Sequence, residues 1–203
     1  MEKLPLYEFT IKEDSDGVEA VAFVDAPAIE VNWKAFDKQQ PIKFAIQNEE
    51  KRIVASPIMI ADLPIYRRDE TLGEYMGVFR KDTIEQIVQK FSKNNLNNSV
   101  NKNHDANQKV EGVYLYQSFI INSEMGINTP KGFDKLADGS WFGFYKVENE
   151  EVWNEVKDGT FKGLSIEGLF DSQLVEAKTE YQFLIEQIEE LTAQLHTYKV
   201  KSI

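Results

Sequence analysis

The 203-residue chain contains no cysteine and only two histidines, and these scarcities exclude several kinds of site. Without cysteine there can be no disulfide, no thiolate metal ligand and no cysteine nucleophile. The histidines are His104 and His196, and His104-Asp105 makes a poor metal site because no second histidine lies nearby. The chain also lacks a phosphate-binding glycine-rich loop of the P-loop or dinucleotide type. We therefore expect neither a metal nor a cofactor.

Long apolar runs and an excess of positive charge are missing too. No run approaches the roughly 20 apolar residues that a membrane-spanning helix needs, and the first residues lack the apolar region of a signal peptide. The 34 Asp and Glu residues outnumber the 23 Lys and Arg residues, and the resulting net charge of −11 opposes binding to nucleic-acid phosphates. The sequence therefore predicts a cytoplasmic protein that binds neither membranes nor nucleic acids.

The apolar residues that are present form many short segments, and 42% hydrophobic residues fit a folded protein. Two helices are expected. One begins with the capping-box-like Asp82-Thr83-Ile84-Glu85, and the other covers 148–157 and ends at Gly159. The first two strands, joined by a turn at 14–17, are expected to form a hairpin. Strands are predicted at 4–11, 18–24, 42–46, 51–60 with a break at Pro57, 75–79, 110–121, 141–147 and 164–170. The predicted fold class is α+β, with a mostly antiparallel β-barrel or sheet and flanking helices.

The last 31 residues have a different pattern. Apolar residues recur there at successive a and d positions of a heptad, and Glu and Gln fill most positions between them. The a and d residues are Leu174, Ala177, Tyr181, Leu184, Ile188, Leu191, Leu195 and Tyr198. The pattern predicts a domain at 1–172 and a coiled-coil helix at 173–203, whose partner is a second copy or another protein's coiled coil. The alternative is an amphipathic helix packed on its own domain.

A serine on a glycine-rich strand is the first candidate for chemistry. Ser165 lies in the segment 159–170, in which Gly163 and Gly168 mark a close approach and a bulge. A small hydroxyl in such surroundings can be approached by another backbone, as a nucleophilic serine requires. By itself, however, the segment fits a solvent-facing serine at least as well.

His104 is the second candidate, because it is the only imidazole outside the charged C-terminal segment. It follows Asn101-Lys102-Asn103, and an imidazole there could serve as a general base near neutral pH. A lone histidine in an Asn-rich loop is more often a simple surface residue. The presence of Ser165 in the same chain is what favours a catalytic role for His104.

Four further segments give the chain a family resemblance. They are Asn-His-Asp at 103–105, Gly-Ser-Trp-Phe-Gly at 139–143, Val-Trp-Asn-Glu-Val-Lys-Asp-Gly at 152–159 and Lys-Gly-Leu-Ser-Ile-Glu-Gly at 162–168. Together with Val-Ala-Phe-Val-Asp-Ala-Pro-Ala-Ile-Glu at 21–30, they resemble the XkdF-like phage serine proteases over roughly residues 5–172. That family is similar to tailed-phage prohead proteases and, more distantly, to herpesvirus assemblins.

The resemblance implies an assemblin-like β-barrel with flanking helices and a Ser–His catalytic core. Ser165 then takes the position of the nucleophile, and His104 takes that of the general base. Related proteases place a third catalytic residue after the serine strand, where this chain instead becomes heptad-patterned. A circularly permuted arrangement would let Asp25 fill that place as the residue that orients His104, with Glu19 and Glu167 as alternatives.

The resemblance also implies a role in capsid maturation. The expected substrates are phage scaffold and major capsid proteins, cleaved in the host cytoplasm inside the prohead, and a homo-oligomer or a scaffold coiled coil is the expected assembly partner. The alternative is a catalytically inactive, protease-like scaffolding or capsid-assembly protein, which should be indifferent to the loss of Ser165 or His104.

Overall fold

The computed structural model describes residues 4–13, 16–25, 45–133 and 135–175, which form an α+β fold. The first half of the chain supplies β1 (Leu6–Thr10), β2 (Gly17–Val24), β3 (Ala45–Asn48), β4 (Ile53–Met59), β5 (Ile65–Asp69), β6 (Gly73–Phe79) and α2 (Lys81–Lys93). The second half supplies η1 (Leu96–Asn98), β7 (Val100–Lys102), β8 (Asp105–Lys109), β9 (Val113–Ile120), β10 (Trp141–Val147), α3 (Glu150–Lys157), β11 (Gly163–Leu169) and β12 (Asp171–Val175).

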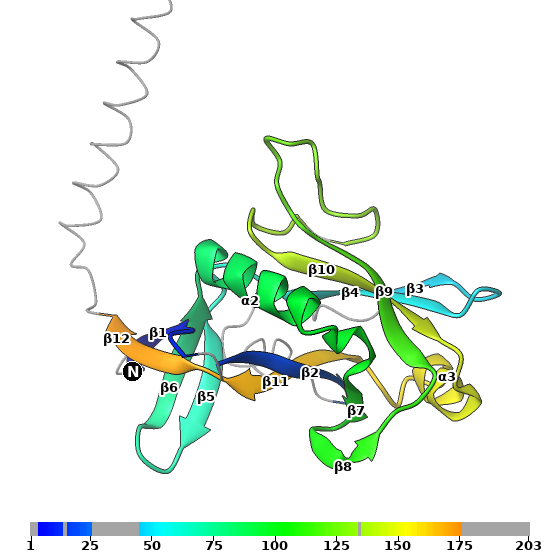
Figure 1. Ribbon diagram of the computed structural model, residues 1–203, viewed down its shortest axis with the longest axis horizontal. Helices are drawn as coiled ribbons and strands as arrows, with labels where there is room; N and C mark the ends of the chain where they lie inside the picture. Colours follow the sequence, from blue (N-terminus) through cyan, green and yellow to red (C-terminus); the bar gives the residue numbers. More distant parts are fainter. Residues whose placement is uncertain (1–3, 14–15, 26–44, 134, 176–203) are drawn as a thin grey trace, which may run out of the picture.

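The strands form three open four-stranded sheets, in the orders β12-β1-β6-β5, β3-β4-β10-β9 and β11-β2-β7-β8 (Figure 1). Most strand pairs are antiparallel, as predicted, while β1–β6 and β2–β7 are parallel. The described strands do not close into a barrel, so that part of the predicted fold class is wrong. Alternating apolar residues specify which face of a strand is buried, and they leave open whether the sheet ends meet.

The predicted hairpin between the first two strands does not form. β1 pairs with β12 and β6, whereas β2 pairs with β11 and β7 in another sheet. β1 and β2 therefore belong to two different sheets instead of pairing with one another. Both β1 and β2 find partners more than 50 positions along the chain, and a local pattern cannot reveal such pairing.

β4 continues through Pro57, where the sequence predicted a break. Pro57 lies opposite Phe142 of β10, while the ladder with β3 on the other side begins only at Ala55. A proline lacks the N–H that a strand with neighbours on both sides would need. Within the described residues β3 does not reach Pro57, so the missing donor costs no ladder bond to β3 there.

Both predicted helices are present, with one difference at a cap. α2 begins two residues earlier than the capping-box pattern implied, at Lys81, and its N-cap Arg80 makes no side-chain capping bond. α3 is capped by Asn149, whose side chain accepts a hydrogen bond from the Val152 N–H. Gly159 follows the end of α3 with a φ of +81°, the left-handed conformation expected of a C-terminal glycine stop.

The core lies between the sheets and beneath α2. The α2 residues Ile84, Ile87 and Phe91 are buried, and the Phe91 ring meets the Trp141 indole of β10 edge-on at 5.1 Å between centroids. A smaller apolar cluster, around Phe142, lies on the other face of the β4–β10 sheet. No helix in the described part of the chain is long and apolar enough to span a membrane.

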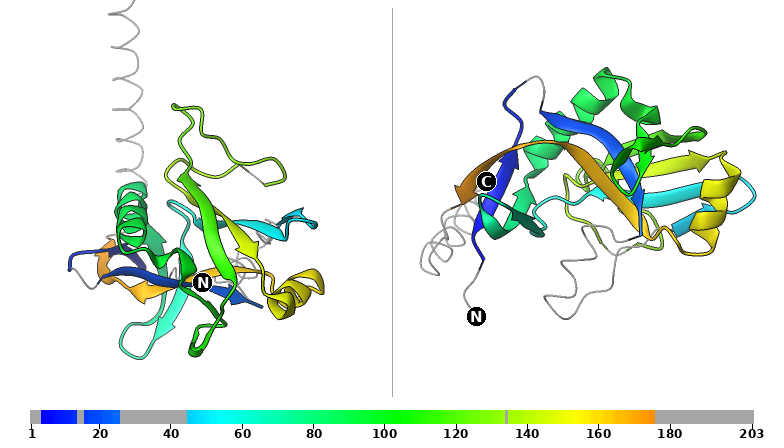
Figure 2. Two further views of the ribbon diagram at one scale, coloured as in Figure 1. Left: turned by 45° about the vertical axis from the view of Figure 1, so that its right-hand side comes forward. Right: turned by 90° about the horizontal axis from the view of Figure 1, so that it is seen from below.

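β11 and β12 follow one another with only Phe170 between them, and they link two of the sheets (Figure 2). The predicted domain boundary after residue 172 falls inside β12, and Leu174, the first predicted heptad position, lies in that strand. Residues 176–203, which hold the rest of the predicted coiled coil, lie outside the described residues. That helix and its partner stay predictions.

Candidate active site

Ser165 lies in the middle of β11, an edge strand of its sheet. It pairs with Ala22 of β2, and its residue surface is 8% exposed. Alternation along the strand sends Leu164 to the opposite face, where it joins the main core. Ser165 is thus a small polar residue held in place by an apolar strand, as the sequence predicted. Its hydroxyl makes no hydrogen bond to any side chain that the structure describes.

His104 lies in the two-residue turn between β7 and β8. Asn103 and His104 both have positive φ, +49° and +61°, which is the backbone of the tight turn that best joins two antiparallel strands. The Asn103 N–H donates to the Phe23 carbonyl of β2 at 3.0 Å, which anchors the turn to the neighbouring strand. The His104 side chain is exposed. The imidazole is therefore accessible on a well-fixed backbone.

Asp25 is exposed at the first position after β2. Its N–H donates to the Asn103 Oδ1 at 3.3 Å, so the residue before His104 contacts Asp25 directly. The contact involves the Asp25 backbone, and its carboxylate makes no hydrogen bond in the described residues. The structure therefore places Asp25 beside the His104 turn without showing the predicted orienting bond.

One sheet thus carries all three candidates on neighbouring strands, with β2 between the strands of Ser165 and His104. Adjacent strands lie about 4.8 Å apart, so about 10 Å separates the backbones of β11 and β7. Across that span, Ser165, Ala22 and Asn101 are in register. No hydrogen bond joins Ser165 to His104 in the described part of the chain. Their catalytic pairing stays a prediction.

The two alternative carboxylates differ in their surroundings. Glu19 is exposed on β2, at the position where the pairing with β11 skips a residue. Glu167 lies two residues beyond Ser165, on the same face, and accepts a hydrogen bond from Asn101 Nδ2. Asn101 is 4% exposed and its Oδ1 has no partner among the described residues. No sequence signal could have singled out Asn101, because an Asn beside an Asn-rich loop has no distinguishing pattern.

A small cavity of about 20 Å³ lies beside β11, whose residues Leu164, Ser165 and Ile166 line it. Its other walls come from β4, β5 and the segments beside them, and include Ile58, Met59, Ile60, Leu63, Ile65, Arg67 and Phe79. Among the described residues of this lining, Arg67 alone is charged. The sequence-based prediction missed it, because no strand was predicted between 60 and 75, where β5 lies. Recognising the Ile65–Arg67 alternation as a strand would have placed both side chains on one face.

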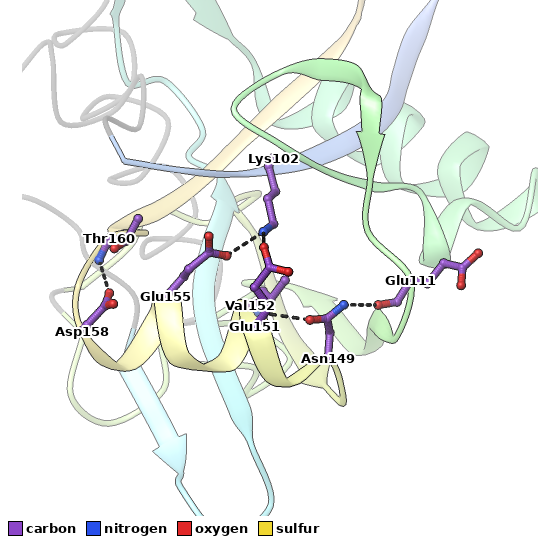
Figure 3. A network of polar contacts seen from close by, with 8 residues as sticks. All are labelled: Lys102, Glu111, Asn149, Glu151, Val152, Glu155, Asp158 and Thr160. Carbon is purple, nitrogen blue, oxygen red and sulfur yellow. Dashed lines mark hydrogen bonds and ion pairs between the residues drawn. The ribbon is translucent and has the colours of Figure 1, made fainter.

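A cluster of charges ties the His104 hairpin to α3 (Figure 3). The Lys102 ammonium lies 2.7 Å from the Glu151 carboxylate and 2.8 Å from that of Glu155. It also lies 5.9 Å from the centroid of the Phe161 ring, in the segment that leads into β11. Burial acts to lower the pKa of Lys102, but the two carboxylates outweigh it and raise that pKa above its ordinary value. Lys102, two residues before His104, thus contacts both α3 and the segment that precedes Ser165.

Replacing Lys102 by Met should lower the free energy of unfolding by about 1–2 kcal/mol at pH 7, since its side chain is only 16% exposed and Glu155 is left without its cation. Denaturant unfolding measures this. Lys12→Met is the control: it removes an ion pair to Asp171 between groups 51% and 42% exposed, and should change stability by less than about 0.5 kcal/mol.

The pH dependence gives a second check on the Lys102 cluster. The Lys102 ammonium lowers the pKa of Glu151. A carboxyl group whose pKa is lowered on folding stabilises the protein above its unfolded pKa, and that contribution is lost as the pH falls. The stability difference between wild type and Lys102→Met should therefore shrink below about pH 4. Equal stability of the two proteins at pH 7 would contradict the role assigned to the cluster.

Comparison with known proteins gives one match. A protein-family model described as "Putative phage serine protease XkdF" matches residues 42–173. The matched region contains both His104 and Ser165, while Asp25 precedes it. No curated protein and no solved structure matches the chain.

Proposed function

Because the chain belongs to the XkdF family of phage serine proteases, we propose that it is a prohead maturation protease with Ser165 as its nucleophile. The observation that carries the proposal is the position of Ser165. It lies inside the matched region, on an edge strand, beside a cavity, and its hydroxyl has no hydrogen bond among the described residues that catalysis would have to break.

The proposed reaction is acyl transfer from a peptide bond to Ser165. An edge strand presents unpaired main-chain groups, so an extended substrate segment can bind along β11 and bring its carbonyl carbon to Ser165 Oγ. His104 accepts the proton of the hydroxyl during the attack and then donates it to the leaving amine. Water next attacks the acyl-enzyme with the same base and releases the second product. Asp25 is proposed to orient the imidazole, for which its contact with Asn103 gives a starting position.

The proposed substrates are the scaffold and major capsid proteins of a phage, cut inside the prohead in the host cytoplasm. A protease that must be enclosed in a growing shell needs a means of incorporation. The heptad pattern of residues 173–203 is suited to this, by pairing with a second copy or with a scaffold coiled coil.

Co-expression with the scaffold and major capsid proteins encoded beside it tests the function. We expect shortened forms of one or both, with new termini that mass spectrometry can identify. The same proteins expressed without the protease provide the control. Assembly of normal particles from full-length scaffold and capsid proteins, with the protease incorporated and folded, would instead support a non-enzymatic assembly role.

Separate substitutions of His104 and Asp25 test the two supporting roles. We expect His104→Gln to lower kcat by at least about 10³-fold, as the loss of a triad base does. Asp25→Asn should lower it less and leave folding intact. His196→Gln removes the other histidine and is the matched control, with unchanged activity. Full activity of Asp25→Asn would transfer the orienting role to Glu19, to Glu167 or to no residue, and full activity of His104→Gln would remove the proposed base.

A further inference from the structure

Arg67 is a cation placed in apolar surroundings next to Ser165. It lies two residues after Ile65 on β5, and strand alternation puts its side chain on the same face as that core residue. Arg67 is half-buried, and burial lowers the pKa of its guanidinium. The other residues around the shared cavity are aliphatic or aromatic, apart from Ser165 itself.

The charge of Arg67 is not neutralised within the part of the chain that the structure describes. Arg52, Arg80 and Lys102 each lie within 4 Å of at least one carboxylate, whereas no carboxylate lies that close to Arg67. Its one hydrogen bond there runs from Nη1 to the Tyr66 carbonyl at 3.1 Å. A guanidinium has five N–H donors arranged as a fork that matches a carboxylate, so most of them are unused. A desolvated cation of this kind is strongly stabilised by a bound anion.

The size of the cavity limits what that anion can be. The cavity measures about 20 Å³ and is partly open to the surface, so the group that contacts Arg67 inside it has to be small. A carboxylate is the smallest anionic group that a peptide side chain carries, and its methylene stem can pack against the aliphatic walls, whereas a phosphate group is larger. A glutamate offers a longer stem than an aspartate for those walls.

We propose that Arg67 binds a carboxylate side chain of the substrate, so that the protease prefers a glutamate close to the bond it cuts. The proposal rests on the protease function proposed above and specifies its substrate. The protein's net charge of −11 repels an acidic peptide at long range, but physiological salt screens that repulsion beyond about 8 Å. At contact distance the guanidinium dominates.

Two peptides that differ only in the charge of one side chain test the proposal. A peptide library first identifies a cleaved sequence, which is then made with Glu or with the isosteric, uncharged Gln at the preferred position. We expect wild type to cleave the Glu peptide with a kcat/KM roughly 30- to 100-fold above that of the Gln peptide, as expected for a charge-assisted bidentate contact. No preference for Glu at any position near the cut would overturn the proposal.

Variants of the arginine then identify the residue responsible. Arg67→Gln should reduce the ratio of kcat/KM for the Glu peptide to that for the Gln peptide, both measured on the same variant, to about one, and Arg67→Glu should favour the Lys version of the peptide. Arg68→Gln, which removes the neighbouring exposed arginine, should keep the wild-type preference. Equal losses for the Glu and Gln peptides in a folded Arg67→Gln protein would show that the guanidinium acts on the reacting carbonyl, which also overturns the proposal.

A binding measurement separates this proposal from the protease function. Ser165→Ala retains Arg67 and should bind the Glu peptide at least about tenfold more tightly than the Gln peptide in a calorimetric titration. If wild type cleaves no peptide but this difference in binding is found, the proposed function fails and the Arg67 site stands. If peptides are cleaved but neither cleavage nor binding discriminates Glu from Gln, the Arg67 site fails and the protease stands.

Discussion

Ser165→Ala should abolish peptide cleavage while leaving the fold unchanged, and this is the largest effect we expect on activity. Loss of the nucleophile should lower kcat by about 10⁶-fold, because the remaining groups cannot form the acyl-enzyme. The hydroxyl makes no hydrogen bond in the described part of the chain, so its removal leaves no buried partner there unsatisfied. Stability should therefore change by less than about 0.5 kcal/mol. A peptide-cleavage assay and a thermal melt on the same preparation measure both quantities.

The control for Ser165→Ala is a serine on another sheet. Ser118 lies on β9, opposite Gly143 of β10, and the Ser118→Ala protein should cleave as wild type does. Cleavage retained at the wild-type rate by a Ser165→Ala protein free of contaminating protease would place the nucleophile elsewhere. A large loss of stability would instead show that the hydroxyl has a structural role in β11.

Gly168→Ala should destabilise the protein by about 2–4 kcal/mol, which is the largest loss of stability that we expect from a single substitution. A Cβ at this position would lie 2.8 Å from the carbonyl carbon of Gly17 and 2.9 Å from the Cα of Val18. Both are backbone atoms of β2, so no side-chain rotation can relieve the clash. The pairing of β11 with β2 shifts register between Glu167 and Gly168, and this bulge brings the two backbones together.

Thermal unfolding measures the effect of Gly168→Ala, and for a chain of this size we expect the Tm to fall by roughly 5–15 °C. Leu169→Ala is the neighbouring control. Leu169 is 58% exposed, and its truncation should change stability by no more than about 0.5 kcal/mol. A Gly168→Ala protein as stable as wild type would mean that β11 and β2 can separate locally without loss of packing elsewhere.

The sequence by itself located the elements whose signals are local. The 3.6-residue spacing of Ile84, Ile87 and Phe91 predicted α2, and Gly159 correctly marked the C-terminal end of α3. The glycine at 168 correctly indicated a bulge. Such predictions succeed because helix periodicity, a left-handed glycine and a close backbone approach each depend on a few consecutive residues. The family resemblance, which the XkdF match confirmed, depended on short motifs in the same way.

Strand partners are what the sequence could not supply. Alternation in β1 and β2 predicted two strands correctly but joined them in a hairpin, and the same kind of pattern suggested a barrel where three open sheets form. β5 was missed, and with it the inward position of Arg67. The period of a strand determines which residues share a face, while its neighbours are decided by long-range packing among segments of similar pattern.

For the candidate site, the sequence determined the residue types and the tertiary structure decided their arrangement. Ser165 and His104 could be chosen because a nucleophile flanked by glycines and a lone imidazole are rare in this chain. Only the fold shows that β2 lies between β11 and β7. It also shows that Asn101 donates a hydrogen bond to Glu167, on the sheet face that carries Ser165, and that Arg67 of another sheet lines the same cavity as Ser165. These residues lie far apart along the chain, and only the packing of the sheets brings them together, because no local pattern encodes a contact between distant segments.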